Sequence, residues 1–240
     1  DHEITDAIPE QIENQILEYL KNNILNFAAV IISDYQKGVL TDNIISHALK
    51  LSKQKNVKTI VDPKRNDFSV YSGASIIKPN LKEAEAAVNK KLKTDKDILD
   101  AGKSILDNCG CEAVLITRGN EGMLLIEKTG VEKISSTAQE AFDVTGARDT
   151  VIAYLGMLLA NGHSYSEAAG IANIAAGVAV RRVGTATVTK DDVLHEMEEI
   201  SSGSNKIMTA DELNAALSVI RKNKKIVFTN GRFHTLHIAH

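Results

Sequence analysis

With 240 residues and a mass of 26.0 kDa, the chain can bury the core of one α/β domain, and its formal net charge of -3 excludes the basic surplus that gripping a nucleic-acid backbone requires. Its two cysteines, Cys109 and Cys111, lie too close in sequence for a disulfide framework, and its longest apolar runs fall short of the ~18 to 20 residues of a membrane span. We therefore expect a cytoplasmic protein of small-molecule chemistry, with neither a nucleic-acid nor a membrane partner.

The first half of the chain alternates between two apolar patterns. Residues spaced four apart indicate amphipathic helices, whereas short continuous apolar runs indicate buried strands. Such alternation predicts a mainly parallel sheet flanked by helices. In chain order we expect a helix carrying Ile8, Ile12, Ile16 and Leu20, a strand at 27–32, a helix near 41–55, strands at 57–62 and 74–78, and a helix from about residue 80.

The second half is predicted to be more helical. A helix at 95–109 leads to a strand at 112–117, and Gly119 and Gly122 mark a tight turn into a strand at 123–126, which we expect to be a hairpin edge. Small residues then indicate two closely packed helices, at 147–160 and 164–182. A third helix is expected near 190–200.

A change of composition near residue 200 predicts a domain boundary. Turn-forming residues at 201–208 suit a linker, Thr209 and Glu212 have the spacing of a helix-capping box, and a strand is expected at 225–229. We thus expect one domain at 1–200 and the start of a second at 209–240. Because the chain opens on Asp1 rather than Met, we expect a fragment.

Polar residues follow the predicted parallel strands, where ligands bind in open α/β sheets. They are Asp34 and Lys37, Asp62 and Lys64, Asn80 and Glu83, Thr117 and Arg118, and the segment 143–149. Polar residues end most strands, so for any single one of these the alternative is an ordinary strand end.

The segment around Gly146 is more specific. A glycine turn that opens a helix presents unpaired N–H groups at the positive end of the helix dipole, which suits a phosphoryl group. Asp149 lies in the first helical turn, where it could accept a proton from an attacking hydroxyl. The alternative is an ordinary helix start with a favourable acidic residue.

Asn80 and Glu83 lie three residues apart at a helix start and could hold hydrated Mg²⁺. The chain has neither the G-x-x-x-x-G-K-[ST] stretch of P-loop enzymes nor a G-x-G-x-x-G stretch after a strand. P-loop and dinucleotide-binding Rossmann enzymes are therefore not supported.

Residues 143–149 resemble the D-x-T-G-A-G-D signature of the ribokinase family, the phosphofructokinase-B-type carbohydrate kinases. Asn80 to Glu83 resembles the family's N-x-x-E magnesium motif, and Thr117 with Gly119 resembles its T-x-G turn. The resemblance implies a ribokinase-like fold that uses ATP and Mg²⁺. It further implies Asp149 as catalytic base, an anion hole at Gly146, Ala147 and Arg148, ATP contacts from Asn80, Leu81, Lys82, Glu83, Thr117, Gly119, Gly122, Asn173 and Gly177, substrate or phosphate contacts from Asp34, Lys37, Asp62 and Lys64, and a water-mediated Mg²⁺ contact from Glu83.

Other stretches resemble the branch of this family that acts on heptose 7-phosphate and carries an adenylyltransferase domain, in bacterial lipopolysaccharide synthesis. They are 33–38, 62–64 and 229–237. The resemblance implies transfer of the ATP γ-phosphoryl group to the anomeric hydroxyl of a heptose 7-phosphate, and it implies that residues 209–240 begin a nucleotidyltransferase-type α/β domain.

The sequence departs from these patterns. Arg148 replaces the second glycine of G-A-G-D, His234 replaces an Asp and Ala239 replaces a Gly, so that His237 and His240 form an adenylyltransferase remnant. The resemblance further implies that family members carry a sugar-binding N-terminal half, which we expect to lie outside this sequence. Two alternatives stay open: an impaired module that binds nucleotide or an assembly partner, and a kinase of another sugar. A homodimer is a further possibility.

Overall fold

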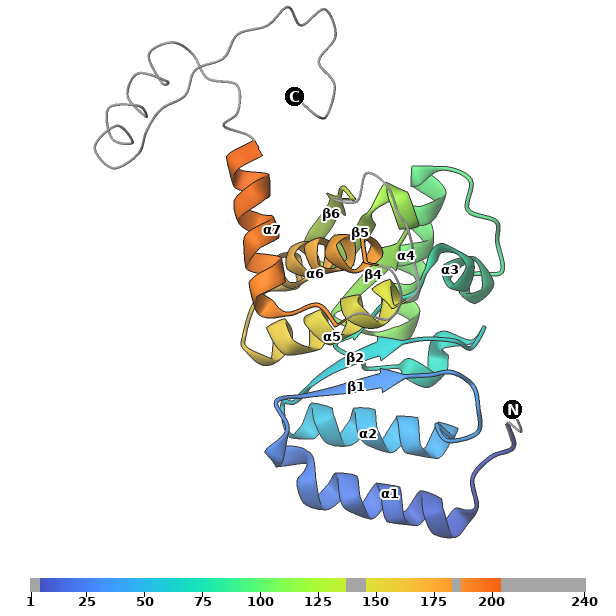
Figure 1. Cartoon of the computed structure of the whole chain (residues 1–240). Helices are drawn as coiled ribbons and strands as arrows, with labels where there is room; N and C mark the ends of the chain where they lie inside the picture. Colours follow the sequence, from blue (N-terminus) through green and yellow to red (C-terminus); the bar gives the residue numbers. More distant parts are fainter. Residues whose placement is uncertain (1–4, 137–145, 183–186, 204–240) are drawn as a thin grey trace, which may run out of the picture. The chain divides into compact units, whose positions relative to one another are not determined.

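The computed structural model describes residues 5–136, 146–182 and 187–203. The chain divides into two compact units, Asp1–Glu196 and Met197–His240. Its helices and strands follow in chain order (Figure 1). They are α1 (Glu10–Asn23), η1 (Ile24–Asn26), β1 (Ala29–Ser33), α2 (Asp42–Gln54), β2 (Lys58–Asp62), η2 (Phe68–Tyr71), β3 (Ile76–Ile77), α3 (Leu81–Ala87), α4 (Asp95–Cys109), β4 (Ala113–Thr117), η3 (Gly119–Glu121), β5 (Met123–Glu127), β6 (Gly130–Ile134), α5 (Ala147–Ala160), α6 (Tyr165–Val180) and α7 (Lys190–Gly203), where η marks a 3-10 helix.

Within the described residues the sheet has six strands in the order of the sequence, β1 to β6. Strands β1 to β4 run parallel, and β4, β5 and β6 form an antiparallel meander. The predicted mainly parallel sheet and the pairing of β5 with β4 are confirmed. The prediction that residues 123–126 form the edge is wrong, because β6 pairs along the other side of β5.

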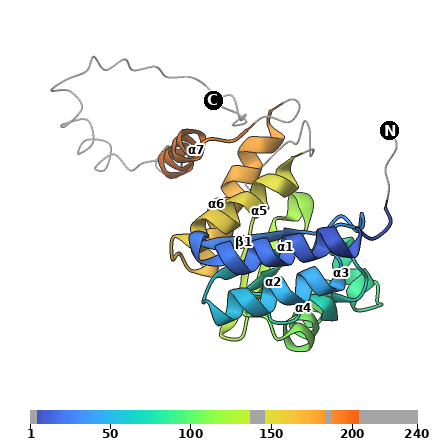
Figure 2. The same ribbon diagram turned by 90° about the horizontal axis from the view of Figure 1, so that it is seen from below.

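The two faces of the sheet are covered by different helices. Alternate strand residues such as Ile32, Val61 and Val114 join a core with α2 and α4, whereas α5 packs across β1 and β2 on the opposite face. In Figure 1, α2 lies below β1 and β2 and α5 lies above them. Figure 2 shows α2 and α4 on the lower side of β1 in that view, with α1 drawn across β1. Both faces are therefore buried, as a parallel sheet requires.

Side-chain caps fix the starts of several helices. Thr94 and Ser164 form capping boxes with Asp97 and Glu167, which satisfy the first N–H groups of α4 and α6. Helix α7 extends to Gly203, so the first three residues of the predicted linker are helical. Across the part of the chain that the structure describes, none of the helices has the length and apolar character needed to span a membrane.

Candidate functional site

The carboxyl ends of the parallel strands bring distant predicted residues to one edge of the sheet. The Asp34 N–H donates to the carbonyl of Asp62 at 3.0 Å, and the Thr117 N–H donates to the carbonyl of Pro79 at 3.0 Å. Asn80 in turn forms an isolated parallel bridge with Thr117. The residues after β1, β2, β3 and β4 thus meet beside one another, and α5 begins at the same edge, where Arg148 contacts Asp62.

A cavity of about 230 Å³ opens beside these strand ends. Its walls come from the β3–α3 connection, the η3 turn, the start of α5 and one face of α6. Leu81 packs instead against the core, Lys82 is exposed, and neither lines the cavity. The lining residues are Lys78, Asn80, Thr117, Gly119, Asn120, Gly122, Met123, Ser136, Ala147, Arg148, Val151, Asn173, Ala176, Gly177 and Val180.

The turn between β4 and β5 forms one wall because its glycines allow a tight path. Gly122 has φ +81°, and a Cβ atom there would lie 2.0 Å from the carbonyl oxygen of Ile134, so no side chain fits. Its carbonyl accepts from the Arg118 N–H at 2.8 Å. Across the cavity, the side-chain amide of Asn173 donates to the carbonyl of Ser135 at 2.8 Å and so ties α6 to the segment after β6.

The helix start at Gly146 has the geometry of an anion site. Gly146 is the N-cap of α5 with φ +84°, a left-handed conformation that favours glycine, and its carbonyl accepts from the Thr150 N–H at 2.9 Å. The N–H groups of the first turn precede the helical hydrogen-bond ladder and lie at the positive end of the dipole. Arg148 has no positive φ, so the replacement of glycine at this position introduces no left-handed backbone strain.

The Arg148 side chain is held by two carboxylates from other elements. Its Nε and Nη2 atoms donate to Oδ2 and Oδ1 of Asp62 at 2.6 and 2.8 Å, and its Nη1 atom donates to Oε1 of Glu83 at 2.7 Å. Nη2 also donates to the carbonyl of Pro63 at 3.1 Å. Burial opposes the charge, but the hydrogen bonds to Asp62 and Glu83 outweigh it and raise the pKa of Arg148.

Lys78 completes this group. Its side chain is buried, and Nζ lies 3.0 Å from Oδ1 of Asp62. Desolvation lowers the pKa of Lys78, and the nearby Arg148 charge lowers it further, whereas Asp62 raises it. Asp62, Lys78, Glu83 and Arg148 thus form one ion cluster, which we call the pocket cluster. The exposed Lys64 adds a weaker contact at its rim, with Nζ 4.0 Å from Oε1 of Glu83.

Asn80 and Glu83 form a capping box at the start of α3. The side-chain oxygen of Asn80 accepts from the Glu83 N–H at 2.9 Å, and Oε2 of Glu83 accepts from the Asn80 N–H at 2.9 Å. From the sequence, this pair is assigned to magnesium and ATP contacts, and the cap is not predicted. The missed signal was the spacing itself, because Asn followed by Glu three residues later is also the pattern of a cap.

Asp149, the predicted base, is exposed and does not line the cavity. Its Oδ1 atom accepts from the hydroxyl of Tyr35 at 3.4 Å, a long hydrogen bond. Tyr35 belongs to the loop after β1. Asp149 therefore lies beside the β1 loop, whereas Ala147 and Arg148 in the same helical turn line the cavity.

The other predicted residues of the β1 loop have different surroundings. Asp34 is buried, and its carboxylate accepts from the Gln36 N–H at 2.8 Å, from Nε of Arg65 at 2.9 Å and from the hydroxyl of Tyr71 at 2.8 Å. We call this group the loop cluster. Lys37 is exposed on the same loop.

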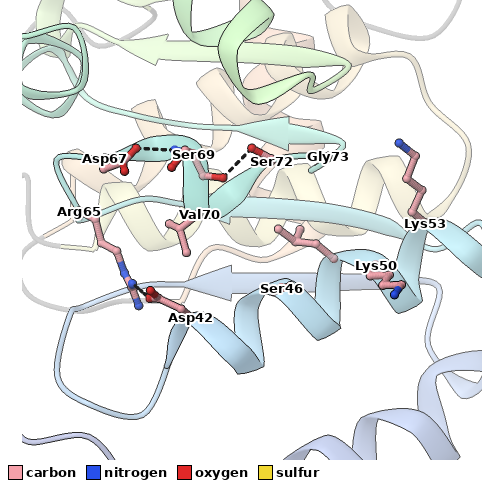
Figure 3. A pocket seen from close by; sticks show the side chains of 11 residues that line it. Asp42, Ser46, Lys50, Lys53, Arg65, Asp67, Ser69, Val70, Ser72 and Gly73 are labelled. Atoms are coloured by element: carbon pink, nitrogen blue, oxygen red, sulfur yellow. Dashed lines mark hydrogen bonds and ion pairs between the residues drawn. The ribbon is translucent and has the colours of Figure 1, made fainter.

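A larger groove of about 680 Å³ lies between α2 and the segment around η2. Figure 3 shows Lys50 and Lys53 on α2 and Asp67, Ser69 and Ser72 on the other wall, with Arg65 paired to Asp42. None of the predicted site residues lines this groove. Volume alone thus does not identify the site, and the smaller cavity is the better candidate because the predicted residues converge there.

Several predicted residues lie outside the described part of the chain. These are His234, His237 and His240, the capping pair Thr209 and Glu212, the strand 225–229, and residues 143–145 of the signature. Among the residues that are described, no group of three or more His, Cys, Asp or Glu side chains is placed to hold a metal ion.

Several known proteins are similar to this chain. Residues 4–192 match the model of the pfkB family of carbohydrate kinases. The chain is 41% identical to the bifunctional protein HldE of Geobacter metallireducens and 37% identical to that of Aliarcobacter butzleri, with 100% of this chain covered in each case and 50% and 51% of the relative. The chain thus spans about half the length of these curated relatives.

Solved structures show the same fold. The chain superposes on phosphofructokinase-2 from Escherichia coli in complex with potassium with a TM-score of 0.69 and 22% identity, covering 81% of this chain and 64% of the other. For the ribokinase of Arabidopsis thaliana, complexed with ribose and ATP, the TM-score is 0.65 at 20% identity, covering 80% and 60%. The predicted ribokinase-like fold is therefore confirmed.

Proposed function

Because the chain belongs to the pfkB family of carbohydrate kinases, we propose that it is the nucleotide-binding part of an ATP-dependent sugar kinase. One observation carries this proposal: Ala147 and Arg148 line the cavity, whereas Asp149, the next residue, lies on the side of the β1 loop. A nucleotide in the cavity would place its phosphates at the start of α5. A sugar hydroxyl beside the β1 loop could then approach Asp149 and the phosphate together.

The α5 turn would perform the transfer through its own groups. The acceptor oxygen bonds to the γ-phosphorus while the bond from that phosphorus to the ADP oxygen breaks, and the hydroxyl proton passes to the Asp149 carboxylate. The N–H groups that follow Gly146 stabilise the charge on the phosphoryl oxygens. Asn173 and Gly177 on α6, with Thr117 and Gly119 opposite, form the walls against which the nucleotide base and ribose would pack.

We propose heptose 7-phosphate as the acceptor, phosphorylated at its anomeric hydroxyl for lipopolysaccharide core synthesis. Two observations support it: the resemblance of segments 33–38 and 62–64 to the heptose branch of the family, and alignment of the whole chain with bifunctional HldE proteins. Lys37 and Lys64 are exposed cations on the loops after β1 and β2, and they are our candidates for the substrate phosphate. Residues 209–240 are proposed to begin an adenylyltransferase domain, of which His237 and His240 would be part.

The test uses a single polypeptide in which this chain is completed by those residues of the Geobacter metallireducens relative that it does not cover. Asp149 is replaced with Asn in this polypeptide. ADP release is measured with heptose 7-phosphate and ATP. Because Asn cannot take the proton, kcat should fall by about 10² to 10⁴ while ATP affinity changes little. Asp191→Asn, at the exposed start of α7, is the matched control. Unchanged turnover in Asp149→Asn would reject the proposed base.

A second candidate function is nucleotide binding without phosphoryl transfer. The observation that favours it is Arg148, a large side chain at the position where the family signature has glycine. Calorimetric titration of the joined polypeptide with ATP, followed by the turnover assay, separates the two. Tight binding without turnover would favour the second candidate, and recovery of turnover in Arg148→Gly would show that only this side chain blocks the reaction.

A further inference from the structure

The acidic residues of the pocket cluster do not fit a magnesium ion, direct or hydrated. Magnesium binding requires carboxylate oxygens that are free to accept its ligand waters or to join its coordination shell. Here Oδ1 and Oδ2 of Asp62 accept from Lys78 and Arg148, Oε1 of Glu83 accepts from Arg148, and Oε2 of Glu83 accepts from the Asn80 N–H. All four oxygens therefore already have donors at 2.6 to 3.0 Å.

The cations, and not these carboxylates, line the nucleotide cavity. Lys78 and Arg148 are among the described residues that line the cavity, whereas neither Asp62 nor Glu83 is. No Asp or Glu occurs among those lining residues at all. A phosphate in the cavity would thus meet the Arg148 side chain and the start of α5, with the buried Lys78 in the wall and no acidic side chain among the described lining residues.

Arg148 is well suited to this position. Its guanidinium engages Asp62 through two parallel hydrogen bonds, which fixes the plane of the fork, and reaches Glu83 with a third nitrogen. The helical backbone at Arg148 is unstrained, and the charge is strongly retained because its pKa is raised. In the family signature this position is a glycine, which has no side chain to reach either carboxylate.

We propose that the Arg148 guanidinium replaces a divalent cation at this site. It neutralises Asp62 and Glu83 and, with Lys78, binds the nucleotide phosphates, so that no metal ion held by protein carboxylates is needed. This inference rests on the proposed nucleotide site. It assigns a ligand-binding role to a residue that departs from the family signature, and it predicts nucleotide binding that does not depend on Mg²⁺. Replacing Arg148 by glycine exposes the two carboxylates and creates a metal requirement.

The first measurement uses metal alone. Mn²⁺ is titrated into the wild-type chain, Arg148→Gly and Arg148→Gly combined with Glu83→Gln, and free Mn²⁺ is followed by electron paramagnetic resonance. We expect no saturable site in the wild type, one site in Arg148→Gly, and its loss in the double variant. Lys90→Ala, which removes the cation paired with Asp97 outside the cavity, is the matched control for nonspecific binding. Should Arg148→Gly fail to fold by circular dichroism, Arg148→Met, which keeps the side-chain stem, replaces it.

The second measurement titrates ATP in excess Mg²⁺ and in excess EDTA. The wild-type affinity should agree within about twofold between the two conditions, whereas Arg148→Gly should bind at least about tenfold more weakly in EDTA, since the loss of one charge-assisted contact is of that size. A wild-type Mn²⁺ site that Glu83→Gln removes would overturn the inference, as would a folded Arg148→Gly without a gained site. If the wild type binds no ATP while the Mn²⁺ titrations give the expected result, the proposed nucleotide site is rejected. The inference that Arg148 occupies the place of a metal ion is then kept.

Discussion

The loop cluster and the pocket cluster are each built on a buried aspartate at the end of a parallel strand. Asp34 follows β1 and Asp62 ends β2, the two strands are neighbours, and the two residues are 3% and 2% exposed. Each aspartate accepts from the Nε atom of an arginine, Arg65 at 2.9 Å and Arg148 at 2.6 Å. In sequence, both are acidic residues at the end of a buried parallel strand.

The two clusters differ in what else their cations contact. Arg65 also pairs with Asp42 and donates to the carbonyl of Leu40, so its contacts close the β1 loop onto α2. Arg148 and Lys78 instead line the cavity in which the predicted ATP residues converge, whereas Arg65 lines only the groove between α2 and η2. The same pairing therefore stabilises a loop in one place and faces the candidate site in the other. Neither burial of a carboxylate with an arginine nor contact of the arginine with a cavity identifies a binding site by itself; the convergence of several predicted residues does.

The largest effect is expected from Asp34→Asn. The substitution removes the charge that Arg65 and Tyr71 share, and breaking a buried ion pair by removal of one partner should lower the free energy of unfolding by about 3 kcal/mol. Urea unfolding followed by circular dichroism measures this. ATP affinity should stay within about twofold, because the loop cluster does not line the cavity.

Asp42→Asn is the control for that variant, because it removes the other carboxylate partner of Arg65. The Asp42 side chain is 80% exposed, and the loss should be no more than about 1 kcal/mol. Equal losses of unfolding free energy in the two variants would contradict the structural role of the loop cluster. A tenfold weaker ATP affinity in Asp34→Asn would contradict its separation from the ATP site.

A smaller effect, dependent on pH, is expected from Tyr71→Phe. The Tyr71 hydroxyl donates to Asp34, and its loss should cost about 1 to 2 kcal/mol near pH 8. Burial and the Asp34 carboxylate raise the pKa of Tyr71 above its ordinary 10.0, so the folded chain keeps a proton that the unfolded chain releases. The stability that this proton confers is present below pH 10 and is lost as the pH rises further.

The stability difference between wild type and Tyr71→Phe should accordingly shrink from pH 8 to pH 11 in unfolding titrations. Tyr19→Phe, an exposed tyrosine of α1, should change the free energy of unfolding near pH 8 by less than about 0.5 kcal/mol. A difference that grows at high pH would have the wrong sign and would reject this account of Tyr71.

The sequence predicts the sheet and the convergence of most of the residues proposed to contact ATP, because both follow from local periodicity and from the geometry of parallel strands. It does not predict β6, since Gly130–Ile134 is mostly exposed and its two apolar residues, Val131 and Ile134, do not alternate. It also does not predict the contacts of Arg148, because Asp62 lies 86 residues away and no local pattern encodes that pairing. The capping role of Asn80 and Glu83 can be predicted from their spacing, but the same spacing also resembles a magnesium motif.

The smallest effect is expected from Tyr35→Phe, which extends the comparison to two tyrosines that each donate to an aspartate. The Tyr71 bond to Asp34 is 2.8 Å long and buried, whereas the Tyr35 bond to Asp149 is 3.4 Å long and exposed, where water can replace it. Stability should therefore change by less than about 0.5 kcal/mol, and kcat with heptose 7-phosphate in the joined polypeptide should stay within about twofold. A loss of kcat of tenfold or more with stability intact would mean that Tyr35 contacts the acceptor or holds Asp149 in place during transfer. The loop after β1 would then belong to the functional site.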